Sequence, residues 1–197
     1  MKLKVKTLFA SILMATLLGC ATTESPLANQ HYDPSNSARI RLYGQNQKPS
    51  IMEVQMDQSN NAKPVKINVG GSIGDAFSSF IRTAENDSIG MPETENTKNL
   101  SARDGILSKA FYREFVIPAG KPVRVYNSFI GLSTTYSMAG TGTATTYGQR
   151  SCASGTINFI PKAGKDYEVG FNQQGNACSV AVFEIQTIDG KTILVPI

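Results

Sequence analysis

Short stretches in which apolar and polar residues alternate recur along this chain, and they limit it to a fold built from β-strands. In residues 38–43, for example, Ala38, Ile40 and Leu42 alternate with two arginines and a tyrosine. Successive side chains of a strand point to opposite faces, so one face of such a stretch lies against a core and the other does not. Turns rich in glycine and proline separate the stretches.

The same alternation predicts strands along most of the remaining chain. They lie at residues 52–56, 65–69, 110–117, 122–130, 156–160, 167–171, 178–185 and 192–197. Asp189-Gly190 is a strong hairpin turn between the last two. Seven or more short strands with closely spaced turns predict a mainly β protein, an antiparallel β-sandwich.

One segment changes period and predicts a short helix at about residues 73–82. Its apolar residues fall three and four apart, as on one face of a helix: Ile73, Ala76, Phe77, Phe80 and Ile81. Ser72 precedes this helix as a possible cap. Gly70-Gly71 enters it through a turn that resembles a phosphate cradle, but no Gly-Lys-Ser/Thr follows, so we expect a packing turn instead.

The N-terminus has the three parts of a secretory signal. Lys2, Lys4 and Lys6 are basic, residues 8–18 form an apolar run, and Gly19 is a small residue before Cys20. The run has only eleven residues, whereas a membrane-spanning helix needs about twenty. An uncleaved membrane anchor is therefore the weaker interpretation.

Leu17-Leu18-Gly19-Cys20 resembles the lipobox of a bacterial lipoprotein. This resemblance implies cleavage before Cys20, lipidation of its thiol, and anchoring to a membrane outside the cytoplasm. Ala21, in place of an aspartate, favours the outer membrane. An ordinary signal peptide is the alternative. We expect a signal peptide at residues 1–19, a polar tether at 20–37 and the β-sandwich domain at 38–197.

Charge and cysteines narrow the possible partners. The formal charge of +4 falls to +1 when the three signal lysines are removed, and no basic cluster suggests nucleic-acid binding. Cys152 and Cys178 remain, which predicts a disulfide in a secreted chain. Within one flat sheet they would lie two strand spacings apart, too far to bond. Either they lie in end loops, or their strands belong to different sheets.

Catalytic and metal-binding residues are scarce. His31 is the only histidine and lies in the expected tether. Zinc sites of the Cys₂His₂ or His₃ type and His-based catalytic triads are thus disfavoured. Glu93 and Glu95 lie in a polar segment with nothing opposite them. We therefore expect no catalytic residues, no metal and no cofactor.

Two turns carry a second resemblance. Residues 117–121, Ile-Pro-Ala-Gly-Lys, and 160–165, Ile-Pro-Lys-Ala-Gly-Lys, each join two expected strands. Across residues 110–184 the chain resembles transthyretin-like or PEGA-like β-sandwich modules of small bacterial lipoproteins. Residues 88–92 and 101–106 are similar to motifs of one such uncharacterised group, to which no activity is attached.

These features favour a lipid-anchored envelope lipoprotein that binds or scaffolds a protein partner without catalysis. The alternative is a lipoprotein that inhibits a secreted enzyme such as a lysozyme; an enzyme is the third choice. Residues 83–104 and 132–149 are long and polar, and the second stretch is either an exposed loop or a threonine-rich hairpin. The expected partner-binding anchors in them are Met91, Tyr136, Met138 and Tyr147.

Overall fold

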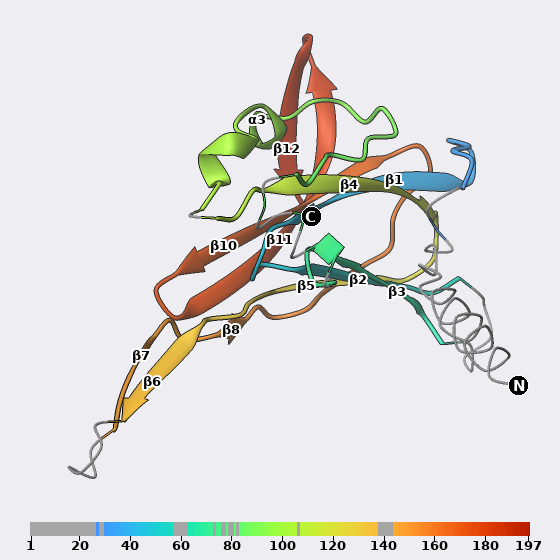
Figure 1. Cartoon of the computed structure of the whole chain (residues 1–197). Coiled ribbons are helices and arrows are strands. Elements are labelled where there is room, and N and C mark those ends of the chain that lie inside the picture. The colour runs from blue at the N-terminus through green and yellow to red at the C-terminus, as the bar shows by residue number, and fades with distance from the viewer. Residues whose placement is uncertain are drawn as a thin grey trace, which may run out of the picture.

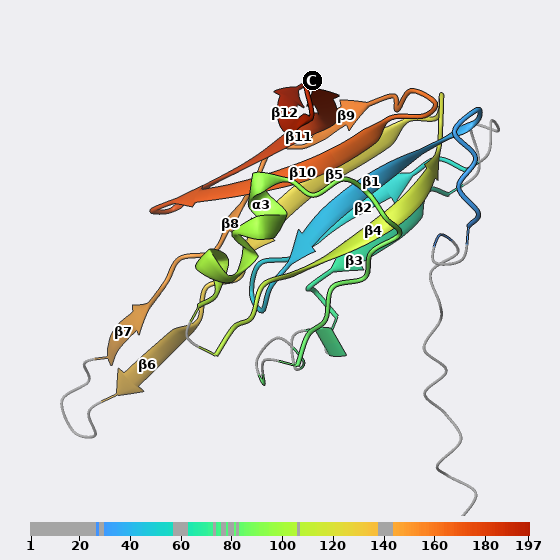
Figure 2. The same cartoon turned by 90° about the horizontal axis from the view of Figure 1, so that it is seen from above.

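Two sheets face each other in this protein, as the alternating sequence pattern predicts (Figure 1). The computed structural model describes residues 27, 30–56, 63–72, 74, 75, 78, 81, 83–105, 107–137 and 144–197. Figure 2 shows the two layers from above, with the chain crossing between them. The predicted β-sandwich is confirmed.

The first sheet has the strand order β12-β11-β10-β1-β4. Its strands are β1 (Ser37–Gly44), β4 (Phe111–Pro118), β10 (Asp166–Gln174), β11 (Ala177–Ile188) and β12 (Lys191–Pro196). Three of its four pairs are antiparallel, but β1 and β10 run parallel. A parallel pair needs a long crossover, and here the chain visits the second sheet between β1 and β10.

The second sheet has the order β3-β2-β5-β8, with β9 also paired to β5. Its strands are β2 (Ser50–Val54), β3 (Val65–Val69), β5 (Val123–Phe129), β8 (Cys152–Ala153) and β9 (Ile157–Phe159). A separate hairpin of β6 (Ser133–Ser137) and β7 (Ala144–Gly148) extends beyond the sandwich in both views. Of the two interpretations of residues 132–149, the hairpin is correct.

The core lies between the sheets and consists of the inward-facing residues of the alternating stretches. Its most buried members include Ile40, Leu42, Met52, Val54, Val69, Phe111, Ile117, Val123 and Val125. Full burial of one such side chain stabilises the fold by about 1.5–3 kcal/mol. Leu27 also belongs to this cluster, so part of the segment expected as a tether packs on the domain.

The Cys152–Cys178 disulfide joins the two sheets. Its Cα atoms are 5.6 Å apart, within the range that a disulfide needs. Cys152 lies in β8 of the second sheet and Cys178 in β11 of the first. The disulfide is therefore confirmed, and of the two geometries left open, strands in different sheets is the correct one.

The glycine turn before the expected helix is a packing device. Gly70 has a φ of +86°, which favours glycine, and its N–H donates to the Asp75 carboxylate at 3.1 Å. The same carboxylate pairs with Arg113 at 2.6 Å. Residues 74, 75 and 78 are helical, whereas Phe77 and Phe80 lie outside the described residues.

Two further short helical turns follow, α3 (Glu95–Lys98) and η1 (Leu100–Arg103). Thr94 caps α3, because its hydroxyl accepts from Thr97 N and the Thr97 hydroxyl accepts from Thr94 N. Both turns belong to the segment 83–104, which runs over the outer face of the first sheet (Figure 1).

Candidate functional site

A buried ion network lies on the outer face of the first sheet. Arg41 of β1 is opposite Glu114 of β4 and Glu168 of β10 in the strand register. Its guanidinium lies 2.6 Å from Glu114 Oε1 and 2.9 Å from Glu168 Oε2. All three side chains are at most 1% exposed. One cation thus holds two carboxylates away from water.

The segment 83–104 supplies the remaining partners of this network. Glu114 Oε2 accepts from the Ser88 hydroxyl and from the backbone N–H groups of Ile89 and Met91. Glu168 accepts from the Thr94 hydroxyl at 2.8 Å and from Asn96 Nδ2 at 2.5 Å. Buried charges are tolerated when their polar atoms are satisfied in this way. The network therefore fastens the segment to the sheet.

The surroundings of the network shift two pKa values. Burial by itself would lower the pKa of Arg41, but the hydrogen bond and charge of Glu114 outweigh burial, so the pKa is raised. Burial, assisted by the charge of Glu168, raises the pKa of the Tyr43 phenol. Arg41 therefore stays charged and Tyr43 stays neutral at physiological pH.

Burial of this network changes the interpretation of the long polar segment. Met91 is only 6% exposed and Leu100 is also buried, so Met91 is not an exposed anchor of the kind that the sequence predicted. Polar side chains of this segment, such as Thr94 and Asn96, donate hydrogen bonds to the buried carboxylate of Glu168 instead of to water. Glu93 and Glu95 do remain exposed.

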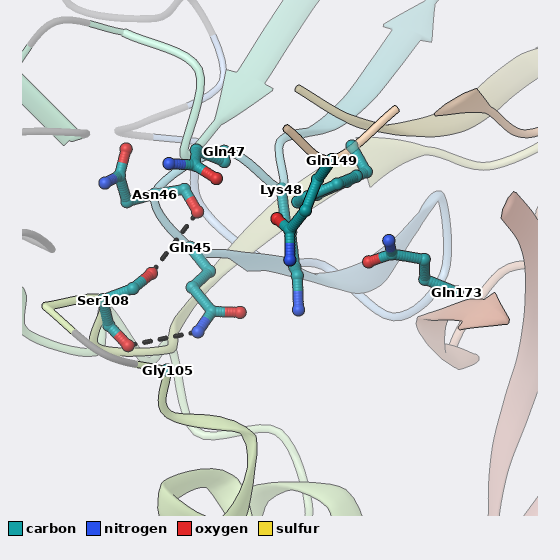
Figure 3. Close-up of a pocket in the computed structure, with 9 residues that line it drawn as sticks. Gln45, Asn46, Gln47, Lys48, Gly105, Ser108, Gln149 and Gln173 are labelled. Carbon is teal, nitrogen blue, oxygen red and sulfur yellow. Dashed lines mark hydrogen bonds between the residues drawn. The ribbon is translucent and has the colours of Figure 1, made fainter. Parts of the chain in front are cut away.

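A polar groove begins next to this network, where β1 ends and the chain turns towards β2. Its first cavity, of about 310 Å³, is shown in Figure 3 and is lined by Gln45, Asn46, Gln47, Lys48, Gly105, Ser108, Phe129, Gln149 and Gln173. A narrow neck of about 40 Å³ shares Gln45 and Lys48 with this cavity. An outer cavity of about 210 Å³ shares Arg103 and Phe171 with the neck.

The groove's polar groups are held by the fold. Gln45 Nε2 donates to the carbonyls of Arg103 and Ser108, at 2.9 and 3.1 Å. Its amide oxygen then points away from Ser108, to the side where Lys48 and Gln173 lie (Figure 3). Asn96 links the groove to the network, because it donates to Glu168 and accepts from Arg103 Nη2 at 2.7 Å.

The outer cavity has a floor of small residues on β10 and β11: Gly170, Ala181 and Ser179. A Cβ at Gly170 would lie 3.0 Å from the Phe183 ring, so the ring packs directly over the glycine. Arg103 and Asn96 line the same cavity. The lining of this part of the groove thus includes both an aromatic ring and a cation.

Within the described residues, no group of three or more histidine, cysteine or acidic side chains could hold a metal ion. The described part of the chain also has no helix long and apolar enough to span a membrane. Known protein families, curated proteins and solved structures offer no match to this chain. Its function has to be inferred from the groove and the sequence.

The expected site residues have different outcomes. Cys20 and Met138 lie outside the described residues, and for Tyr136 and Tyr147 the structure gives a backbone position in β6 and β7. Met91, the one expected anchor whose side chain the structure describes, is not among the residues that line the groove. Sequence reasoning missed Arg41, Glu114 and Glu168, although each lies on the polar side of an alternating strand.

Proposed function

We propose that this chain is a lipid-anchored extracytoplasmic protein whose β-sandwich binds an envelope component without catalysing a reaction on it. The lipobox-like sequence Leu17-Leu18-Gly19-Cys20, at the end of a short apolar run, carries the proposal. Two acyl chains on Cys20 would hold the protein stably at a membrane. The disulfide is consistent with an oxidising compartment outside the cytoplasm.

Binding is supported by the polar groove. Its first cavity, of about 310 Å³, reaches the size at which ligand pockets begin. In such pockets a small number of polar groups, held in fixed positions, orient the ligand. Gln45 and Arg103 are prearranged here by hydrogen bonds within the domain. The groove is therefore the surface on which we expect a partner.

Fractionation of cells that express the full chain tests the anchor. The parent protein should be found in outer membranes, with a lipidated N-terminal cysteine in its mass spectrum. Cys20→Ser should lose both lipid and membrane association, while Ala21→Asp should keep the lipid but remain in the inner membrane. An unmodified Cys20 thiol in the mature parent would refute the anchor.

The alternative, inhibition of a secreted enzyme, is supported by the β6–β7 hairpin, which extends beyond the sandwich (Figure 2). Gln149 N donates to Leu132 O at 3.1 Å, so a short turn can replace residues 133–148 without moving the ends. The full chain should then inhibit lysozyme, and the shortened variant should not. Equal inhibition by both, or by neither, would rule out this role for the hairpin.

A further inference from the structure

The charge of the polar groove is unbalanced. Lys48 and Arg103 line it, and among the residues that the structure describes no aspartate or glutamate lines its three cavities. Neither cation forms an ion pair within the described part of the chain. Lys48 is half-buried, where an unpaired ammonium is less well solvated than at the surface. An anionic ligand would supply the missing partner.

The rest of the lining suits hydroxyl groups. Eight amide side chains line the three cavities of the groove, from Gln45 in the first cavity to Asn172 in the outer one. An amide has both donors and an acceptor, which matches a hydroxyl group that donates and accepts at once, although both polar atoms of Asn96 already bind Glu168 and Arg103. Because Gln45 Nε2 is already bound to two carbonyls, its oxygen is the atom left for a ligand.

The neck contains a buried acceptor without a partner. Asn127 is 1% exposed and lines the neck. Its Nδ2 donates to Ser50 Oγ, whereas its Oδ1 has no hydrogen-bond partner in the described part of the structure. An unsatisfied buried acceptor destabilises the fold, so a donor that enters the neck, from a ligand or a water, would be favoured.

The outer cavity fits the face of a sugar ring. Three small residues, Gly170, Ala181 and Ser179, line it, and the Phe183 ring packs on Gly170. A pyranose has an apolar C–H face that packs on an aromatic ring and equatorial hydroxyls that reach outwards. Arg103 donates to Asn96 Oδ1 through Nη2 at 2.7 Å, and its further N–H groups can bind a carboxylate on the same sugar.

From these observations we propose that the polar groove binds an acidic oligosaccharide, a sugar chain that carries carboxylate groups. Lys48 binds one carboxylate by charge, Arg103 binds another in bidentate fashion, and the amides bind the hydroxyls between them. An extended acidic peptide fits less well, because it presents few hydroxyls to so many amides. The inference rests on the proposed extracytoplasmic location, where such polysaccharides are accessible.

Titration calorimetry with the full chain carrying Cys20→Ser, in low-salt buffer without calcium, tests this inference. The probes are hexamers of galacturonic acid, neutral hexamers of glucose and a hexamer of glutamate. We expect the uronic acid hexamer to bind best, with an affinity that falls as salt is added. Equal binding of the glucose or glutamate hexamer, or no binding of any probe, would overturn the proposal.

Variants identify the site. Lys48→Gln and Arg103→Gln should each weaken binding of the uronic acid hexamer on the order of tenfold, and Lys191→Gln, at an exposed lysine on β12, should not. The Lys48 ammonium has no ion pair among the described residues, so Lys48→Gln should fold normally and decides the outcome if Arg103→Gln does not fold. Unchanged affinity in Lys48→Gln would refute the site.

The calorimetry and the fractionation of Cys20→Ser fail independently. If the protein is lipidated but its groove binds none of the three probes, the acidic-oligosaccharide proposal is wrong and the proposed function stands. If the mature parent protein carries no lipid but the groove binds the uronic acid hexamer, the groove proposal stands and the proposed membrane anchor is wrong.

Discussion

Arg41 Nη2 lies 2.6 Å from Glu114 Oε1, and neither side chain is more than 1% exposed. Glu168 lies on the other side of the same guanidinium, at 2.9 Å. Removal of Arg41 would leave two carboxylates facing each other in an environment without water. The network is therefore sensitive to the loss of its single cation.

Arg41→Met keeps most of the side-chain volume and removes the charge. We expect it to lower the free energy of unfolding by about 3–5 kcal/mol, the cost of breaking a buried ion pair from one side. Urea denaturation followed by circular dichroism measures this loss. Arg124→Met is the control, because Arg124 pairs with Glu53 but is 55% exposed, and such pairs contribute about 0–1 kcal/mol. Equal losses would mean that Arg41 is not buried.

Thr94 fastens the segment 83–104 at its centre. Thr94→Val removes both the cap of α3 and the hydrogen bond to Glu168, and a bond to a charged group contributes about 1.5–3 kcal/mol. We expect faster hydrogen exchange at the amides of Ile89 and Met91, with strands of the second sheet unchanged. Thr187→Val, at an exposed position of β11, should leave the exchange unchanged. Uniform acceleration throughout the domain would instead indicate global destabilisation.

The alternating pattern was sufficient to predict the strands and the sandwich. The strands expected at residues 38–43, 65–69 and 178–185 are found there as β1, β3 and β11. They could be predicted because a period of two is a property of the local sequence. The pattern could not reveal that the polar side of β1 is also buried. Arg41 is charged like a surface residue, and only the pairing of β1 with β4 and β10 brings two glutamates to it.

The groove was equally hidden from the sequence. Lys48 and Arg103 are 55 residues apart. Both line the neck because η1 returns to the end of β1, where Gln45 binds the Arg103 carbonyl. Contacts of this kind depend on topology and have no local periodic signal. The disulfide could be predicted from cysteine number, but which sheets it joins required the strand order.

The disulfide should contribute measurably to stability because it links the two sheets. It closes a loop with a sequence separation of 26, for which the chain-entropy estimate is roughly 3–4 kcal/mol. We expect the Cys152→Ser/Cys178→Ser double variant to unfold at a lower urea concentration by that free energy. Reductant should destabilise the parent protein and leave the double variant unchanged. Two free thiols in unfolded, unreduced parent protein would contradict the bond.

Tyr43 should make the protein lose stability at alkaline pH. Its pKa in the folded state is raised above the usual value of 10.0, first by burial and then by Glu168, so the folded state keeps a proton that the unfolded state releases. The free energy of unfolding that the Tyr43 proton contributes is therefore fully present below pH 10. It falls as pH rises above 10, by up to about 1.4 kcal/mol for each pH unit. Tyr43→Phe removes this proton, so its free energy of unfolding should decline less steeply than that of the parent between pH 9 and 11, in parallel urea titrations at each pH. Tyrosinate absorbance should show one more phenol ionising when the parent unfolds at this pH than when Tyr43→Phe unfolds. Parallel decline of both proteins would mean that the Tyr43 phenol ionises as readily in the folded state as in the unfolded chain.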